Sequence, residues 1–183
     1  MGYMGASNRR YTMITISNTE QDLFTAIRAW LLTIVPGTWE VVQGQDNLVS
    51  MPASQFVVMT SAGLDRLATN IDVLDQTGLI NNIANQFRYK IQLDFYGIGS
   101  SEYAAITSTL LRDQDTPDQF PNYIKPLYGD DLMQIPLVTA GSNYLERWKL
   151  TSYFQFNPVI TNGTQSANVV NSGLVPVDIF FNA

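Results

Sequence analysis

Residues 87–97 read FRYKIQLDFYG and give the clearest indication of the fold. Apolar or aromatic side chains alternate with charged or polar ones from Phe87 to Phe95. A β-strand sends successive side chains to opposite faces of its sheet, so this period of two predicts a strand with one apolar face and one polar face. Gly97 follows as the exit from the strand.

Residues 144–157 show the same alternation and form the second strong strand prediction. Their apolar face holds Trp148, Leu150, Phe154 and Phe156, and their polar face holds Arg147, Lys149, Thr151, Tyr153 and Gln155. Shorter runs predict further strands at 11–16, 39–43, 55–60 and 175–181. Residues 61–86 have no clear period and receive no element, and Asn157-Pro158 and Asn162-Gly163 indicate turns.

Two helices are predicted. Ser17 and Glu20 have the spacing of a capping box, so the first helix begins near Asn18, and Pro36-Gly37 ends it. Its apolar stripe consists of Leu23, Phe24, Ile27, Trp30, Leu31, Ile34 and Val35. Ser100 or Ser101 caps the second helix, which runs to about Arg112 with Tyr103, Ile106, Leu110 and Leu111 on one side.

These elements predict an α+β fold, in which a mainly antiparallel β-sheet packs against two principal α-helices. A length of 183 residues fits a single domain. We place that domain at residues 18–183, after a flexible N-terminal arm at residues 1–17.

The composition excludes several classes of protein. Ten basic and sixteen acidic residues give a net charge of −6, which argues against gripping nucleic acid through its phosphates. Without cysteine the chain has neither disulfides nor thiolate metal ligands. Residues 1–10 lack the apolar core of a signal peptide and no segment is long enough to span a bilayer, so an intracellular, soluble chain is expected.

The inventory of chemical groups points away from catalysis. Without histidine, Ser-His-Asp triads and histidine-bound metals are excluded. Gly97-Ile98-Gly99 has Glu102 where a dinucleotide-binding loop needs its third glycine, so a tight turn with a helix cap is preferred. We predict no catalytic residue, no cofactor and no metal site.

Residues 113–131 form a predicted acidic loop with five aspartates, three prolines and one lysine. The aspartates are Asp113, Asp115, Asp118, Asp130 and Asp131. The first three lack the glycine and glutamate of a calcium loop, and the adjacent last two lack the separate environments of an acid and a base. A solvated acidic loop is therefore the preferred interpretation.

Arg88 and Lys90 share the polar face of one predicted strand, and Arg147 and Lys149 share that of the other. If the strands pair, the four cations lie on one sheet face, as a solubilising surface or as a docking surface. The acidic loop offers a complementary patch, which suits identical subunits that meet side by side in a ring. Reversing Arg147 and Lys149 to glutamate is then expected to weaken the ring and leave the fold intact.

Three segments resemble a known family. They are QLDFYG at 92–97 followed by Ser100-Ser101, ERW at 146–148 leading into YFQFN at 153–157, and Met51-Pro52 before FVVMT at 56–60. In order and spacing they are similar to the neck or tail-terminator proteins of tailed bacteriophages, over about residues 18–181.

The resemblance implies a structural virion protein of the tail or neck, assembled in the host bacterial cytoplasm. Such proteins form a homo-oligomeric ring, usually a hexamer, on the last ring of the tail-tube protein. They stop its polymerisation and present a surface to the neck or head-completion protein, and DNA passes through the lumen without its sequence being read. No membrane partner and no catalytic residue are implied.

Other functions remain open at this point. A connector or tail-completion protein one layer away is the nearest alternative. A glycan-binding or small-ligand module using Trp39, Tyr96 and Trp148 as stacking platforms is a second, although alternation assigns Trp148 to the core. A carboxylate-based hydrolase is the least favoured, because no pair of acids stands in an identifiable cleft.

Overall fold

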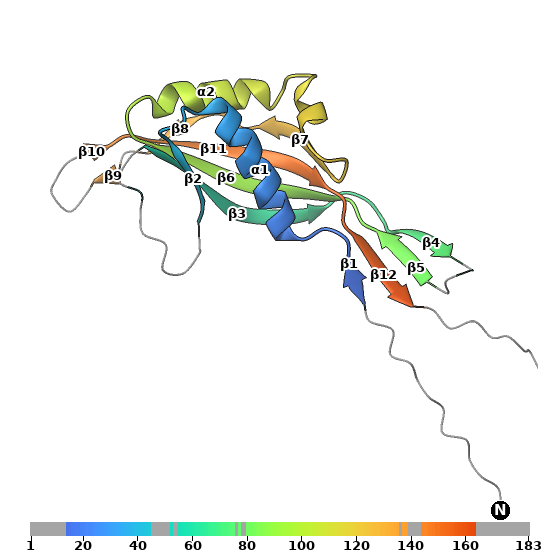
Figure 1. The fold of residues 1–183 in the computed structure, drawn as a ribbon. Coiled ribbons are helices and arrows are strands. Elements are labelled where there is room, and N and C mark those ends of the chain that lie inside the picture. The colour runs from blue at the N-terminus through green and yellow to red at the C-terminus, as the bar shows by residue number, and fades with distance from the viewer. Residues whose placement is uncertain are drawn as a thin grey trace, which may run out of the picture.

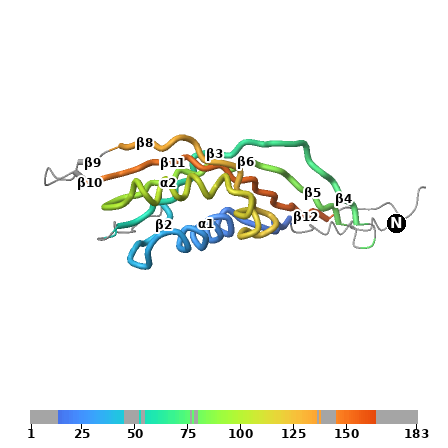
Figure 2. Tube along the Cα trace, turned by 90° about the horizontal axis from the view of Figure 1, so that it is seen from above, coloured from blue at the N-terminus to red at the C-terminus, as the bar shows by residue number. Residues whose placement is uncertain are grey.

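The computed structural model describes residues 14–44, 52, 55–75, 77, 80–135, 137–138 and 144–163. These residues form two helices, a large sheet and a small sheet, both largely antiparallel, and one further pair of short strands. The predicted α+β class is confirmed. Both helices lie on one face of the large sheet, and the small sheet extends away from this body (Figures 1 and 2).

The large sheet contains, in spatial order, β2 (Glu40–Gln43), β3 (Phe56–Arg66), β6 (Phe87–Tyr96), β11 (Arg147–Phe156) and β7 (Ile124–Gly129). β8 (Met133–Gln134) also pairs with β11. β2 and β3 run parallel, and all other pairs are antiparallel. The two strongest strand predictions thus become the neighbours β6 and β11, although the second is divided: Tyr144–Leu145 forms the separate strand β10, which pairs with β9 (Leu137–Val138).

The small sheet contains, in order, β1 (Thr15–Ile16), β12 (Val159–Gly163), β5 (Ile80–Ala84) and β4 (Ile71–Asp75). Three of its strands continue the three central strands of the large sheet in the same order, β4 after β3, β5 before β6 and β12 after β11 (Figure 1). At the junction the Leu67 amide donates to the Gln86 carbonyl at 2.9 Å, and the Asn85 amide donates to the Pro158 carbonyl at 3.2 Å. The small sheet is therefore an outward continuation of the sheet that builds the core.

The core lies between the large sheet and the helices α1 (Glu20–Ile34) and α2 (Ser100–Leu110). The predicted apolar stripe of the first helix is confirmed, since Leu23, Phe24, Ile27, Trp30, Leu31 and Val35 are buried. Tyr89, Ile91, Leu93 and Phe95 of the predicted apolar face of β6 are buried with them, whereas Phe87 is only half-buried. Leu150, Phe154 and Phe156 of β11 are also buried. Alternation on two strands and a helical stripe together account for most of this core.

The predicted cap of α1 is wrong by two residues. Thr19, not Ser17, is the N-cap: the Asp22 amide donates to its hydroxyl at 3.3 Å, and the Thr19 amide donates to the Asp22 carboxylate at 2.7 Å. Ser17 is instead used by the small sheet, because its hydroxyl accepts from the Val159 amide at 3.0 Å. Ser17 therefore has a partner in the small sheet, and Thr19 caps the helix.

The start of α2 also differs from the prediction. Gly99 is the N-cap, with a φ of 85°, and neither predicted serine caps the helix through its side chain. Gly97 has a φ of 98°, and a Cβ there would lie 2.7 Å from the Gln55 Cγ, so the turn needs glycine at this position. The predicted tight turn is confirmed, whereas Ile106 is 45% exposed and does not belong to the buried side of the helix.

Regular structure is present where no element was predicted. Residues 61–86 contain the end of β3 and both β4 and β5, and residues 113–131 contain a 3-10 helix (Thr116–Gln119) and β7. Asn162-Gly163 lies in β12 and not in a turn. β4 has no buried residue, so its sequence lacks the alternation that burial on one face imposes.

Some predictions lie outside the described residues. These are the strand at 175–181, residues 1–13 of the N-terminal arm, and residues 11–13 of the first predicted strand, of which Thr15–Ile16 is present as β1.

Candidate interaction surfaces

The outer face of the large sheet, defined as the face turned away from α1 and α2, carries the polar residues of β6 and β11. All four predicted cations, Arg88, Lys90, Arg147 and Lys149, lie on this face. The antiparallel register pairs Arg88 with Gln155 and Arg147 with Tyr96, so one pair of cations lies at each end of β6. At about 3.4 Å per residue, the two ends are roughly 20 Å apart. The structure therefore forms two separate cationic positions instead of one patch.

The first position is built around a buried carboxylate. Asp94 is 4% exposed and pairs with Arg147 at 3.0 Å, while the Gln92 side-chain amide donates to the same carboxylate at 2.6 Å. Arg147 also lies over the Tyr96 ring, which stacks on Phe56 at 4.5 Å. Burial, followed by the negative charge of Asp94, raises the pKa of Tyr96. Arg147 is thus held by contacts within its own subunit. Lys149 lies opposite Asp94 in the register of β11 and β6.

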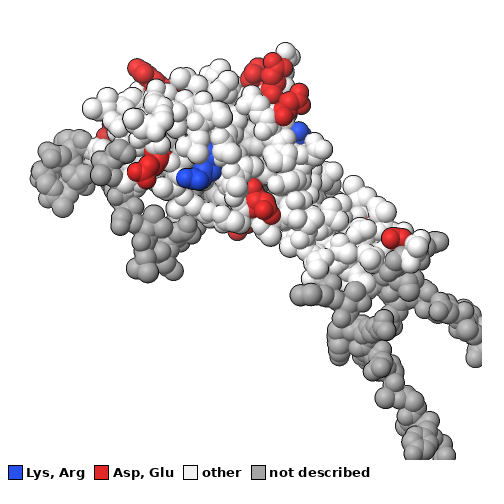
Figure 3. Space-filling model, viewed as in Figure 1, with Lys and Arg blue, Asp and Glu red and all other residues white. Residues whose placement is uncertain are grey.

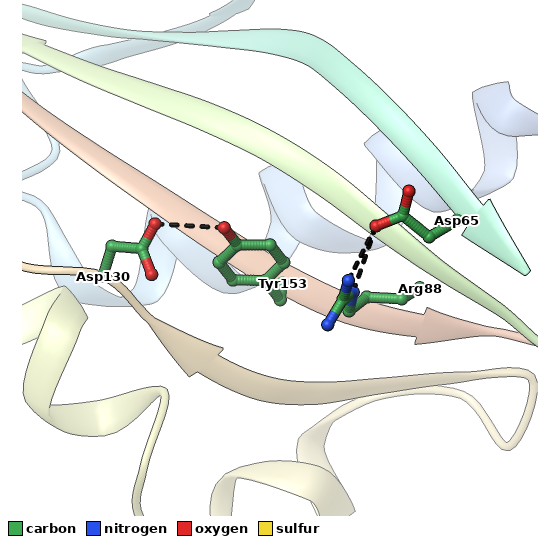
Figure 4. A network of polar contacts seen from close by, with 4 residues as sticks. All are labelled: Asp65, Arg88, Asp130 and Tyr153. Carbon is green, nitrogen blue, oxygen red and sulfur yellow. Dashed lines mark hydrogen bonds and ion pairs between the residues drawn. The ribbon is translucent and has the colours of Figure 1, made fainter. Parts of the chain in front are cut away.

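The second position is a chain of polar contacts across three strands and the residue after β7 (Figure 4). Arg88 pairs with Asp65 of β3 at 2.8 Å and lies over the Tyr153 ring of β11. The Tyr153 hydroxyl donates to Asp130 at 3.1 Å. Asp65, Arg88, Tyr153 and Asp130 are thereby connected, and we call this group the outer-face network.

Neighbouring groups strengthen the outer-face network. Tyr128 of β7 stacks on Tyr153 at 4.6 Å, and Lys90 also lies over the Tyr153 ring. Burial, followed by the hydrogen bond to Asp130, raises the pKa of Tyr153. The hydrogen bond to Asp65 raises the pKa of Arg88. Sequence reasoning missed Asp65, Tyr128 and Tyr153, although the polar-face position of Tyr153 was visible in the alternation.

The five predicted aspartates do not form one patch. Asp113, Asp130 and Asp131 line a hollow at the end of α2, together with Ser108, Thr109, Leu110 and Arg112. Asp115 and Asp118 belong to the start of the 3-10 helix and do not line this hollow. Figure 3 shows acidic side chains near the end of α2, on a face that is otherwise mostly uncharged.

The three aromatic residues of the alternative ligand-binding hypothesis are not brought together. Trp39 is buried against Tyr103 on the helix side, at a ring distance of 5.0 Å. Trp148 packs against the core, and Tyr96 is buried on the outer face. Among the described residues, no group of three or more acidic side chains could hold a metal ion, and no helix is long and apolar enough to cross a membrane.

A second surface lies along α1. The groove between α1 and β2 has a volume of about 420 Å³ and is lined by apolar residues that include Phe24, Ala29, Leu32, Val41 and Val42. Arg28 is the one charged residue in this lining, and its Nε donates to the Val41 carbonyl at 2.9 Å.

These features define an α+β protein. Its described residues present two candidate interaction surfaces, the polar outer face of the large sheet and the mainly apolar groove between α1 and β2. A family model for phage neck terminator proteins matches residues 21–182, most of the chain. The chain therefore belongs to the phage neck terminator protein family, as the resemblance predicted. It is a structural protein of the phage virion, in the neck or tail, and not an enzyme.

The comparison with solved structures found a chain from the virion of a native gene transfer agent particle. The similarity covers 75% of this chain and 91% of that chain, at 11% sequence identity and a TM-score of 0.28. The comparison with curated proteins found no match.

Proposed function

We propose that this protein forms a ring at the end of the phage tail tube, stops the polymerisation of the tube and joins the tail to the neck. The observation that carries the proposal is the family match over residues 21–182. The partners are identical subunits in a ring of six, the tail-tube protein below and a neck or head-completion protein above. Assembly takes place in the host bacterial cytoplasm.

The low surface charge supports this role. Only 14% of the residues are charged, against roughly 25% in typical soluble domains. Uncharged polar surface loses less free energy when it is desolvated at a contact between proteins. A net charge of −6 also suits a lumen through which DNA slides, because a negative wall does not retain phosphates.

In the proposed ring, the cationic residues on the outer face of the large sheet contact a neighbouring subunit. Arg147 is a poor choice for a test, because a glutamate there would lie beside the buried Asp94 and disturb the fold. Lys90 is the cleaner position, since it is in no ion pair among the described residues and lies opposite Tyr153, whereas Lys149 lies opposite Asp94 and is changed only to a neutral residue. Lys90→Glu with Lys149→Gln is expected to weaken ring assembly, whereas unchanged assembly would assign these cations to solubility.

The proposed function is tested with the purified protein and tail-tube subunits. Native mass spectrometry at increasing concentration is expected to show a closed ring, and electron microscopy is expected to show shorter tubes with one ring at an end. A strict monomer that never caps tubes would overturn the proposal. A ring that binds only the neck connector would assign the protein to the adjacent layer.

A further inference from the structure

In the part of the chain that the structure describes, the small sheet is a single layer. Both helices lie over the large sheet, and the small sheet extends beyond them (Figures 1 and 2). Its faces nevertheless carry apolar side chains: Ile16, Leu74, Ile83 and Ile160 on one face, and Ile71, Val73, Ile80 and Val159 on the other. Its four strands hold two charged residues, Asp72 and Asp75.

Such a sheet is expected to be covered in the assembled protein. A sheet is stable when it buries a face against another element, and an apolar surface rimmed by polar residues indicates a contact site. The exposure is greatest on the edge strand β4, where Val73 is 57% and Leu74 is 55% exposed. β4 pairs with β5 alone among the described strands, so within the described part of the chain it is the edge of the small sheet.

The groove between α1 and β2 matches β4 in polarity and charge. Arg28 and Leu32 are exposed neighbours one turn apart on α1, with Cβ atoms about 6 Å apart. Asp72 and Leu74 are two residues apart on one face of β4, at about 7 Å. The attachment points of an aspartate and a leucine on the strand thus have a spacing similar to those of an arginine and a leucine on the helix.

We propose that β4 of one copy docks in the groove between α1 and β2 of a neighbouring copy, with Asp72 against Arg28 and Leu74 against Leu32. The inference rests on the proposed ring. The small sheet points away from its own body, so the groove that it fills belongs to a second copy (Figure 1). Because strand and groove are different surfaces, the contact is head-to-tail, and repeated contacts close a ring when the rotation allows it.

The absence of cysteine from the chain makes a cross-linking test direct. In the double variant Leu32→Cys with Leu74→Cys, the only thiols lie on the two proposed surfaces, both exposed in the monomer. Mild oxidation of the assembled protein is expected to give a ladder of covalent oligomers that a reductant collapses to monomer. The matched control pairs Leu74→Cys with Ile106→Cys, which is equally exposed but lies on α2, and is expected to give no ladder.

A charge exchange provides the second measurement. Asp72→Arg alone and Arg28→Asp alone are each expected to raise the concentration needed for half-assembly by roughly tenfold. The double exchange Asp72→Arg with Arg28→Asp is expected to restore most of that loss. Restoration would not follow if either substitution acted only on the stability of its own subunit.

The outcomes separate this inference from the proposed function. Rings in native mass spectrometry without the Leu32–Leu74 ladder, or with an equal ladder from the control pair, would overturn the inference and leave the ring in place. A covalent dimer from Leu74→Cys alone would show that small sheets meet each other, which also overturns it. A monomer at every concentration would overturn both.

Discussion

Asp94 and Asp65 each form an ion pair with an arginine on the large sheet, but the two carboxylates differ in exposure. The Asp94 side chain is 4% exposed and the Asp65 side chain is 59% exposed. Water competes for an exposed ion pair, whereas Arg147, whose side chain is 22% exposed, is only partly solvated when it loses its carboxylate. The same type of contact therefore supports the fold at one position and contributes little at the other.

We expect Asp94→Ala to lower the free energy of unfolding by about 2 kcal/mol, because Arg147 and Gln92 both lose their partner. Asp65→Ala is the matched control and is expected to cause no measurable change, because Arg88 remains solvated. Urea unfolding followed by tryptophan fluorescence measures both. Equal effects of the two substitutions would contradict the distinction.

Tyr89 is the residue whose protonation depends most clearly on folding. Its hydroxyl donates to Glu20 and accepts from Ser61 at 2.9 Å, which ties β6 to α1 and β3. Burial, followed by the hydrogen bond to Glu20, raises its pKa from 10.0 to about 12. The folded state thus holds this proton more tightly than the unfolded state does.

The stabilisation that this proton provides is fully present below pH 10 and is lost as the pH rises toward 12. We expect the free energy of unfolding to fall over this range, and Tyr89→Phe to make the fall shallower. Absorbance titration of the folded protein should show one late tyrosine that the variant lacks. An identical pH dependence in both proteins would contradict the assignment.

At the scale of elements, helix α1 carries the groove surface and is fixed at its start by the Thr19 capping box. The backbone hydrogen bond from Thr19 lowers the pKa of Asp22 below its ordinary value of 3.8. The hydrogen bonds from Thr19 to the ionised Asp22 carboxylate are therefore at full strength above pH 3.8. They weaken as the pH falls further through the lowered pKa of Asp22.

Thr19→Ala is expected to destabilise the protein by about 1 kcal/mol, the usual cost of losing an N-cap side chain. Thr25→Ala is the control, because it makes the same change at an exposed position inside α1. Alanine favours a helix interior, so the control should match or slightly exceed the parent. Thermal unfolding at neutral pH compares them, and equal melting temperatures for all three proteins would argue against the cap.

At the scale of the whole molecule, the large sheet holds the packed core and the small sheet extends beyond the helices. Amide exchange reports local opening, and a single-layer sheet without a helix cover opens at low cost. The two parts should therefore differ in stability within one subunit and become more alike on assembly.

We expect amides of β4 and β5 to exchange rapidly in dilute protein and at least tenfold more slowly in concentrated, assembled protein, since the proposed contact covers β4. Amides of β6 and β11, at the centre of the large sheet, provide the internal control. Hydrogen exchange followed by mass spectrometry measures both sets. Rapid exchange of β4 in both states would show that assembly leaves the small sheet uncovered.

The amino-acid sequence was sufficient to predict the strands at the centre of the fold, the apolar stripe of α1 and the family. These features are local, because burial on one face imposes a period of two on a strand and a helical period on a helix. Alternation in β6 and β11 also placed Arg88, Lys90, Arg147 and Lys149 correctly on one face.

The contacts between those residues could not be predicted from the sequence and follow from the three-dimensional fold. The antiparallel register separates the two pairs of cations and brings Asp94 to Arg147 and Tyr153 to Asp130, partners far apart in the chain. The structure also revealed β4 and β5, which have no buried residue and so leave no period in the sequence, and β7, whose sequence includes Pro126 and Gly129. The single-layer sheet and the groove beside α1 depend on which elements cover one another, and no local pattern records that arrangement.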